Sequence, residues 1–231
     1  MGALAPNEAM ARRALELVPQ GARLGLGSGR AAQAFVRVLG ERVREGLQVR
    51  CVPTSRATEA LAAREGVPLA TLEELGELDL AVDGADEVSP ALDLVKGYGG
   101  ALVREKIVAA ASRRLVILAQ PAKQVAALGA RGVLPVEVVA FGWSYCARRL
   151  AELGLRPARR LAGEAPFVSD GGNHVLDCAV SPIADPADLE RSLAAIPGVV
   201  GTGLFLGLAS VVFLEDERGE VTVLHRPGAA P

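Results

Sequence analysis

Hydrophobic residues in the first half of the chain form short unbroken runs, and segments of helical periodicity separate these runs. We expect buried strands at 23–27, 47–52, 80–82 and 115–119, and helices at 9–18, 31–43, 56–65 and after Gly100. Asn7 and Thr54-Ser55 stand where helix N-caps are expected. Because the strand runs are continuous rather than alternating, they predict a doubly wound, mostly parallel sheet of Rossmann-like α/β class.

The pattern changes after Lys123, where alternating strands and amphipathic helices follow one another. Strands are expected at 134–139, 161–169 and 175–180, short strand-like runs at 199–200 and 204–206, and helices at 143–153 and 185–196. The turn 170–173 reads Asp-Gly-Gly-Asn, which is typical of a hairpin between the strands beside it. This order predicts a small α+β, ferredoxin-like domain at 130–204. The α/β domain would comprise 1–129 and 205–231, with returning strands at 211–215 and 221–225.

Composition narrows the class of protein. Half of the 231 residues are hydrophobic but only 3% are aromatic, so leucine, valine and alanine must build the core. A net charge of −2 gives no electrostatic reason to expect nucleic acid or an anionic membrane as partner. Three cysteines without a C-x-x-C pair, and an N-terminus without the apolar core of a signal peptide, favour the reducing cytoplasm. The uncharged segment 192–214 has bilayer length, but Pro197-Gly198 and further glycines favour two buried strands instead.

The stretch 78–107 concentrates the candidate chemistry. A strand ends in Asp83-Gly84-Ala85-Asp86-Glu87, a glycine loop follows at 96–100, and Arg104-Glu105-Lys106 interrupts an apolar helix. Open α/β sheets place their sites where strands end and helices begin. Each piece also has a plainer interpretation, because Asp-Gly is an ordinary turn, Asp86-Glu87 suits a solvated loop, and 104–106 suits the wet face of a surface helix. Their occurrence in one strand–loop–helix unit favours a site.

Glu105 is the most informative residue of this stretch. At helical spacing it shares a side with Leu102 and Ala109, and Val103 and Ile107 form the neighbouring apolar stripe. A carboxylate at the edge of an apolar face is partly desolvated, which makes it a better base.

A second candidate site follows the first predicted strand, at Gly25-Leu26-Gly27-Ser28-Gly29-Arg30. Backbone N–H groups of such a loop, with the next helix's positive end, suit a bound anion. The spacing also satisfies a loose dinucleotide pattern, but the following strand carries Arg50 and no acidic residue. A monophosphate is therefore favoured over a dinucleotide, and a tight turn without ligand is the plainer alternative. His174 and His225, the only histidines, show no metal-ligand spacing, and no Ser/His/Asp set is apparent. Lys123 follows a buried strand and suits either an anion or solvent.

The chain resembles the ribose-5-phosphate isomerase A family along nearly its whole length. The resemblance rests on these segments: Gly25–Gly29, Pro53-Thr54-Ser55, Asp83-Gly84-Ala85-Asp86-Glu87, Lys96-Gly97-Tyr98-Gly99-Gly100-Ala101-Leu102-Val103-Arg104-Glu105-Lys106, Leu134-Pro135-Val136-Glu137 and Ile196-Pro197-Gly198-Val199-Val200. It implies a cytoplasmic homodimer that takes a small sugar phosphate from the non-oxidative pentose phosphate pathway and needs no metal or cofactor. It makes Glu105 the proton acceptor and gives Asp83, Asp86 and Lys96 catalytic roles. Substrate-binding residues would be Ser28, Gly29, Arg30, Ala31, Asp83, Gly84, Ala85, Asp86, Lys96, Gly97, Tyr98, Gly99 and Lys123. The domain at 130–204 would contribute to dimerisation.

The phosphate loop departs from the family. That loop usually reads Gly-Thr-Gly-Ser-Thr, whereas here Gly27-Ser28-Gly29-Arg30-Ala31 lacks the last two hydroxyls and gains a guanidinium. Arg30 would either bind phosphate through paired hydrogen bonds or point to solvent. Tyr98 also stands where glycine is common, and Asn7 where a lysine is. These changes leave two rivals to an isomerase, an NADP-dependent dehydrogenase using Arg50 and a non-catalytic sugar-phosphate sensor.

Overall fold

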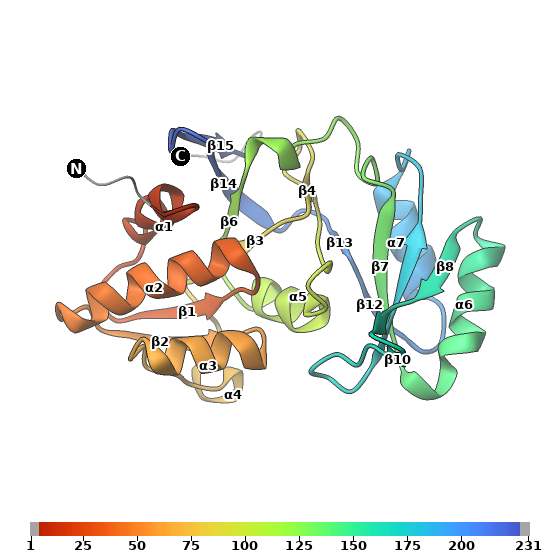
Figure 1. Cartoon of the computed structure of the whole chain (residues 1–231), viewed down its shortest axis with the longest axis horizontal. Helices are drawn as coiled ribbons and strands as arrows, with labels where there is room; N and C mark the ends of the chain where they lie inside the picture. Colours follow the sequence, from red (N-terminus) through yellow and green to blue (C-terminus); the bar gives the residue numbers. More distant parts are fainter. Residues whose placement is uncertain (1–4, 227–231) are drawn as a thin grey trace. The chain divides into compact units, whose positions relative to one another are not determined.

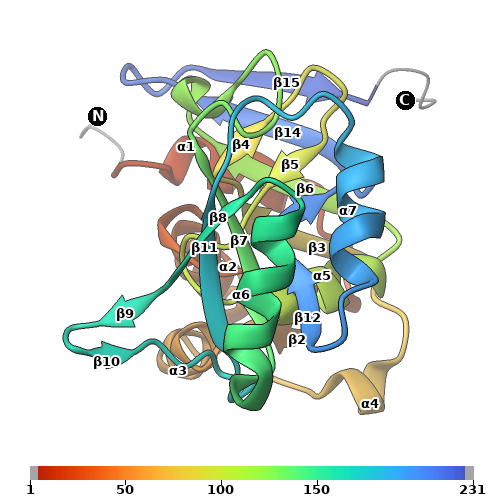
Figure 2. The same ribbon diagram turned by 90° about the vertical axis from the view of Figure 1, so that its right-hand side faces the viewer.

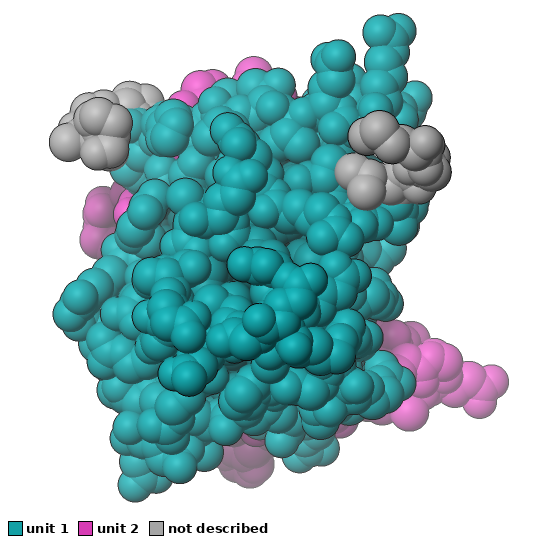
Figure 3. Space-filling model, turned by 90° about the vertical axis from the view of Figure 1, so that its left-hand side faces the viewer, with its two compact units in different colours: residues 1–85, 104–123, 208–231 teal, residues 86–103, 124–207 magenta. Residues whose placement is uncertain are grey.

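The computed structural model describes residues 5–226, and the chain forms two compact units (Figure 3). The first unit comprises 1–85, 104–123 and 208–231, and the second comprises 86–103 and 124–207. The second unit thus contains the predicted α+β segment 130–204 and, in addition, the loop that carries Lys96. The chain passes between the units four times, at 85/86, 103/104, 123/124 and 207/208.

The first unit is built on a six-stranded sheet in the order β15-β14-β6-β3-β1-β2 (Figure 1). Its strands are β1 (Ala22–Leu26), β2 (Val49–Pro53), β3 (Leu80–Gly84), β6 (Leu115–Ala119), β14 (Ala209–Glu215) and β15 (Val221–His225). Every pairing is parallel except that of β14 with β15. The predicted doubly wound, mostly parallel sheet is confirmed.

Helices cover both faces of this sheet. On one face, α1 (Glu8–Leu15) and α2 (Arg30–Arg44) bury Met10 and Phe35 in a cluster with Leu24, Val82 and Leu118 of the strands. Helix α3 (Arg56–Arg64) adds to the same cluster, and the short α4 (Leu72–Leu75) follows it. On the other face lies α5 (Leu102–Ala110), packed so tightly that a Cβ atom on Gly25 would stand 2.3 Å from Val108 Cγ1.

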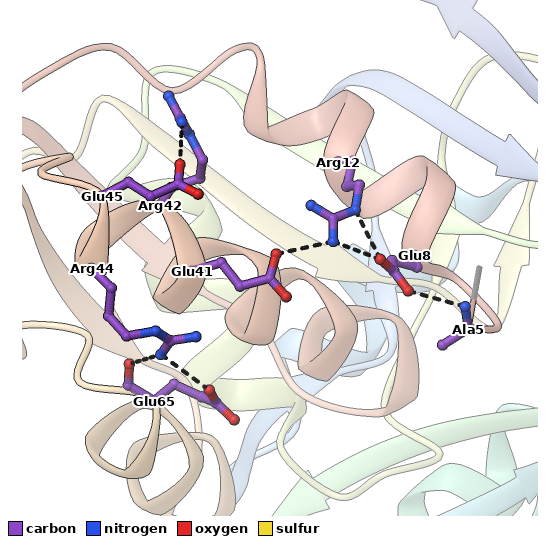
Figure 4. A network of polar contacts seen from close by, with 8 residues as sticks. All are labelled: Ala5, Glu8, Arg12, Glu41, Arg42, Arg44, Glu45 and Glu65. Atoms are coloured by element: carbon purple, nitrogen blue, oxygen red, sulfur yellow. Dashed lines mark hydrogen bonds and ion pairs between the residues drawn. The ribbon is translucent and has the colours of Figure 1, made fainter. Parts of the chain in front are cut away.

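Ion pairs join the solvent sides of the helices α1, α2 and α3 (Figure 4). Arg12 contacts Glu8 at 2.7 Å and Glu41 at 2.9 Å, and Arg44 donates to the Glu65 carbonyl oxygen at 3.1 Å. Exposed pairs of this kind contribute at most about 1 kcal/mol each. The buried apolar cluster therefore provides most of the stability of this unit, and the exposed ion pairs add little to it.

The N-terminus of α1 is capped differently from the prediction. Asn7 has a φ of 69° and its side chain makes no capping hydrogen bond. Instead the Glu215 carboxylate, at the end of β14, accepts the Asn7 N–H at 2.9 Å and the Met10 N–H at 2.8 Å. A distant strand thus supplies the negative charge that a helix N-terminus favours.

The second unit contains a four-stranded antiparallel sheet in the order β12-β7-β11-β8 (Figure 2). Its strands are β7 (Val133–Val138), β8 (Arg156–Arg159), β11 (His174–Ala179) and β12 (Val199–Thr202), and its helices are α6 (Trp143–Glu152) and α7 (Pro186–Ala194). Val136, Leu150, Leu176 and Leu193 lie in its core. A smaller sheet joins β13 (Leu204–Phe205), β5 (Leu94–Val95) and β4 (Glu87–Val88).

The predicted hairpin between 161–169 and 175–180 forms only at its turn, where Val168 pairs with His174 in antiparallel fashion and the Ser169 N–H donates to the Asn173 carbonyl oxygen at 2.9 Å. Segment 161–169 does not pair along β11; β8 does, and β9 (Leu161–Ala162) and β10 (Ala165–Pro166) form a separate two-stranded turn. Strand β8 reads Arg-Pro-Ala-Arg, which has no hydrophobic alternation, so its sequence carried no strand signal. The uncharged segment 192–214 forms the end of α7 and the strands β12, β13 and β14, in keeping with the predicted buried strands. Within residues 5–226, none of the helices has the length and hydropathy needed to cross a bilayer.

Candidate active site

Asp83 lies at the carboxyl end of the central strand β3, and its side chain is 3% exposed. Its Oδ1 atom accepts the N–H of Ser28 at 3.1 Å and that of Gly84 at 2.7 Å. The neighbouring loop passes so close that a Cβ atom at Gly27 would stand 2.1 Å from Asp83 Oδ1. Gly27 is therefore required by the close approach of the first glycine loop to this carboxylate.

Four hydroxyl groups gather behind that loop. The Ser28 hydroxyl lies 2.8 Å from that of Thr54 and donates to that of Ser55 at 2.7 Å. Thr58 donates its hydroxyl proton to the Gly27 carbonyl oxygen at 2.9 Å. Ser55 does cap α3, accepting the Thr58 N–H at 3.1 Å, but the link to Ser28 was missed from sequence. The local sequence carries no signal of this link, which arises because Leu26 of β1 pairs with Pro53 of β2 and so brings the two strand ends together.

The loop leads directly into α2, as expected for an anion site. Gly29 precedes the helix with a φ of 88°, a conformation that favours glycine, and the 15-residue helix begins at Arg30. Ala31 is partly buried, whereas Arg30 is exposed. The positive end of α2 thus begins directly after Ser28 and Gly29, a position that favours a bound phosphate.

Glu105 lies on the face of α5 that is turned toward the sheet. Its side chain is 6% exposed, and Val108, one turn later, packs against Gly25 of β1. Asp83 shares its face of β3 with Ala81, which also borders Gly25, so both carboxylates belong to the layer between α5 and the sheet. The wet-helix interpretation is therefore wrong for Glu105. The neighbouring apolar stripe of Val103 and Ile107, by contrast, is not buried, because Val103 is partly exposed and Ile107 is 51% exposed.

Lys123 ends the 3₁₀ turn Pro121–Lys123, which follows β6 at the same sheet edge as Asp83. It is partly exposed. The first unit therefore holds Ser28 to Ala31, Asp83 to Ala85, Glu105 and Lys123.

The second unit holds the other candidate residues, Asp86 directly before β4 and Lys96 to Gly99 in the loop between β5 and α5. The Lys96 side chain is 3% exposed, and its ammonium nitrogen lies 5.4 Å from the centre of the Phe205 ring. The Asp86 carboxylate accepts the Tyr98 N–H at 3.0 Å. The Tyr98 hydroxyl donates to the Val133 carbonyl oxygen at 3.2 Å. Burial, together with the nearby charges of Glu87 and Asp86, raises the pKa of Tyr98 to about 12.

Glu87 is a structural residue rather than solvated loop charge. It is fully buried and accepts the N–H groups of Gly129 at 2.6 Å and Arg131 at 2.7 Å. It thereby fixes the segment leading into β7, next to the candidate loop of the second unit.

His174 and His225 are partly buried and exposed, respectively. Across residues 5–226, no group of three His, Cys, Asp or Glu side chains is arranged to hold a metal ion. Asp83 and Asp86 are three residues apart, so the chain alone keeps their Cα atoms within about 11 Å of each other.

Comparison with known proteins assigns the family. The family model for ribose 5-phosphate isomerase A (phosphoriboisomerase A) matches residues 50–219. The chain is 52% identical over 226 residues to ribose-5-phosphate isomerase A of Gloeobacter violaceus, covering 97% of each chain. The solved structure of ribose 5-phosphate isomerase A from Methanocaldococcus jannaschii superposes with a TM-score of 0.90 at 37% identity, covering 95% of this chain and 97% of the other. A second solved D-ribose-5-phosphate isomerase, in complex with phospho-erythronic acid, gives a TM-score of 0.91 at 32% identity, covering 95% and 97%. The sequence, the fold and these matches agree that the chain belongs to the ribose-5-phosphate isomerase A family.

Proposed function

We propose that the chain interconverts D-ribose 5-phosphate and D-ribulose 5-phosphate, with Glu105 as the base that moves the proton between C2 and C1. The observation that carries this assignment is the nearly buried Glu105 carboxylate on α5, in the same layer as Asp83. Family membership supports the reaction and the substrate. An aldose–ketose isomerase needs one base that reaches both carbons, and a carboxylate between a helix and a sheet edge suits that role.

The reaction passes through an enediolate. The Glu105 carboxylate takes the proton from C2 of the open-chain aldose, and negative charge develops on O1. A proton then passes from the O2 hydroxyl to O1, and the Glu105 carboxylic acid returns its proton to C1 as O2 becomes the carbonyl oxygen of the ketose. The Lys96 ammonium group and N–H groups of its loop would stabilise the developing oxyanion. Asp83 and Asp86 would hold sugar hydroxyls and assist opening of the ring.

The loop 28–31 would bind the phosphate. The N–H groups at the start of α2, the Ser28 hydroxyl and Lys123 would replace the contacts that family members make through two further hydroxyls. We propose that Arg30 adds a charge-assisted contact, since it is exposed at the first turn of α2. Arg30→Ala should then raise KM for ribose 5-phosphate more than it lowers kcat.

One assay separates this proposal from both rivals. Incubation with ribose 5-phosphate, followed by measurement of ribulose 5-phosphate, should show turnover that phospho-erythronic acid inhibits competitively. A sensor would bind the sugar phosphate without turnover. A dehydrogenase would bind NADPH, and the residue it needs for the 2′-phosphate, Arg50, lies beside Glu74 at 3.7 Å. Absence of product with folded protein would contradict the isomerase assignment.

We also propose that the protein is a cytoplasmic homodimer whose second unit provides the interface. Phe141 is fully exposed there, and Val139 and Val200 are 43% and 42% exposed. Apolar side chains left at the surface of one unit are typical of a surface that a second copy covers. Light scattering should give twice the chain mass for the wild type and a smaller mass for Phe141→Asp. The three cysteines are free and buried, which suits a reducing compartment.

A further inference from the structure

Arg160, a residue of the second unit outside the loop 96–100, binds the backbone of that loop. Arg160 follows β8, and its Nη1 atom donates to two successive carbonyl oxygens of the loop, Gly97 at 3.0 Å and Tyr98 at 3.1 Å. Its Nε and Nη2 atoms donate to the two carboxylate oxygens of Asp177 on β11, at 2.9 and 2.5 Å. The Arg160 side chain is 14% exposed, so this fork is largely shielded from solvent.

Arg160 and Asp86 hold opposite ends of the same peptide group. In a trans peptide the C=O and N–H bonds point in opposite directions. The Gly97 carbonyl oxygen is bound by Arg160, and the N–H of that peptide, carried by Tyr98, is bound by the Asp86 carboxylate at 3.0 Å. The orientation of the peptide that follows Lys96-Gly97 is therefore fixed from both sides. By the same geometry, the bond to the Tyr98 carbonyl turns the Gly99 N–H away from Arg160.

Neighbouring side chains pack closely against two glycines of the loop 96–100 and restrict its backbone. Gly97 has a φ of 111° and a Cβ atom there would stand 2.8 Å from the Leu102 side chain. Gly100 has a φ of 81° and a Cβ atom there would stand 2.3 Å from the Phe167 ring. That ring also lies 5.6 Å from the Arg160 guanidinium group. The guanidinium and the ring thus fix the loop at its middle and at its end.

We propose that Arg160 is a positioning residue for isomerisation, which acts by fixing the 97–99 backbone and, through it, the Lys96 ammonium group. This inference rests on the proposed role of Lys96 at the oxyanion. Asp177 orients the guanidinium, and the guanidinium orients the loop. A group that stabilises the transition state through fixed geometry loses much of its effect when it is displaced by about 1 Å, which corresponds to about 100-fold in rate. Arg160 touches no reacting atom in this account, so its loss should lower kcat and leave KM for ribose 5-phosphate nearly unchanged.

The first test compares two neighbouring arginines. Arg160→Ala and Arg160→Lys should each lower kcat, by about 100-fold for alanine, because an ammonium group cannot bind Asp177 and both carbonyls at once. The matched control is Arg159→Ala, whose guanidinium lies 4.2 Å from the Trp143 ring. It should keep wild-type kcat. Guanidinium ion at millimolar concentration should restore part of the activity of Arg160→Ala, and ammonium ion should not. The lysine variant keeps a cation beside Asp177, so it reports on the fork even if the alanine variant folds poorly.

The second test asks whether Arg160 acts through Lys96. In a double-mutant cycle with Lys96→Gln, the two losses in kcat should be clearly less than multiplicative, because removing Lys96 leaves Arg160 little to position. Multiplicative losses, or wild-type kcat in both folded Arg160 variants, would overturn the proposal. If Lys96→Gln impairs turnover and the Arg160 variants do not, only this inference fails. If Lys96→Gln is fully active, the proposed role of Lys96 fails and the inference fails with it.

Discussion

Replacing Thr58 by valine tests how the first glycine loop is held. Thr58 is 1% exposed, and its hydroxyl donates to the Gly27 carbonyl oxygen at 2.9 Å. The N–H of the same peptide, carried by Ser28, donates to Asp83 at 3.1 Å. Thr58→Val keeps the shape of the side chain, but it leaves this peptide tied only at its Asp83 end. It also removes a partner of the Ser28 and Ser55 hydroxyls.

The expected magnitude follows from the lost hydrogen bonds. A buried carbonyl oxygen left without its donor costs about 1–3 kcal/mol in the free energy of unfolding. If about 1.4 kcal/mol of this falls on the loop that binds the phosphate, affinity for ribose 5-phosphate drops about tenfold. KM should therefore rise about tenfold, and kcat should fall less, because Glu105 is untouched.

A second threonine of the same unit provides the control. Thr71 caps α4 on the exposed surface and accepts the Glu74 N–H at 3.2 Å. Thr71→Val should cost about 1 kcal/mol of stability without changing KM. Denaturant unfolding and steady-state isomerisation of both variants give the comparison. If Thr58→Val shifted KM no more than Thr71→Val, the hydroxyl cluster would be a stability feature only.

Three further predictions concern ionisation and capping. Because the pKa of Tyr98 is raised from 10.0 to about 12, its contribution to stability is complete below pH 10 and is lost as pH rises toward 12. The difference between the absorbance titrations of the wild type and of Tyr98→Phe should place the ionisation of this phenol near pH 12, and ionisation near pH 10 would refute the prediction. Burial raises the pKa of Cys51 and of Cys178 to about 12, so these thiols should react with a disulfide reagent at pH 8 only after unfolding, and rapid labelling of the native protein would contradict their burial. Glu215→Ala should lower the free energy of unfolding by about 3 kcal/mol, since two N–H groups of the α1 terminus lose a charged acceptor; a loss within error of zero would show that the cap is unimportant.

Local sequence patterns predicted most of the fold because the hydrophobic runs and capping residues of most elements agree with the structure that these elements adopt. Strand β6 matches its hydrophobic run residue for residue, and α7 begins after Asp185, whose side chain accepts the Asp188 N–H at 2.9 Å. The errors concern features that depend on distant residues. The cap of α1 is Glu215, about two hundred positions away, and β8 is a strand only because β11 pairs with it. No local pattern contains either fact.

The same distinction applies to the site. Asp83 and Glu105 stood out because a carboxylate at a strand end or on an apolar helix face is locally unusual. Thr58 and Arg160 did not, because one is an ordinary helix residue and the other an ordinary surface arginine until the sheet order brings Gly27 and Gly97 beside them. Residues that hold a site in place are specified by tertiary structure, and sequence spacing alone rarely shows them.

The turnover of Glu105→Gln decides whether Glu105 is the base that moves the proton. Glutamine has nearly the shape of glutamate but cannot accept the C2 proton, so the fold should survive while the base is lost. With an unfolding midpoint close to that of the wild type, kcat for ribose 5-phosphate should fall by about 10²–10⁴. Near wild-type kcat in the folded variant would contradict Glu105 as the base.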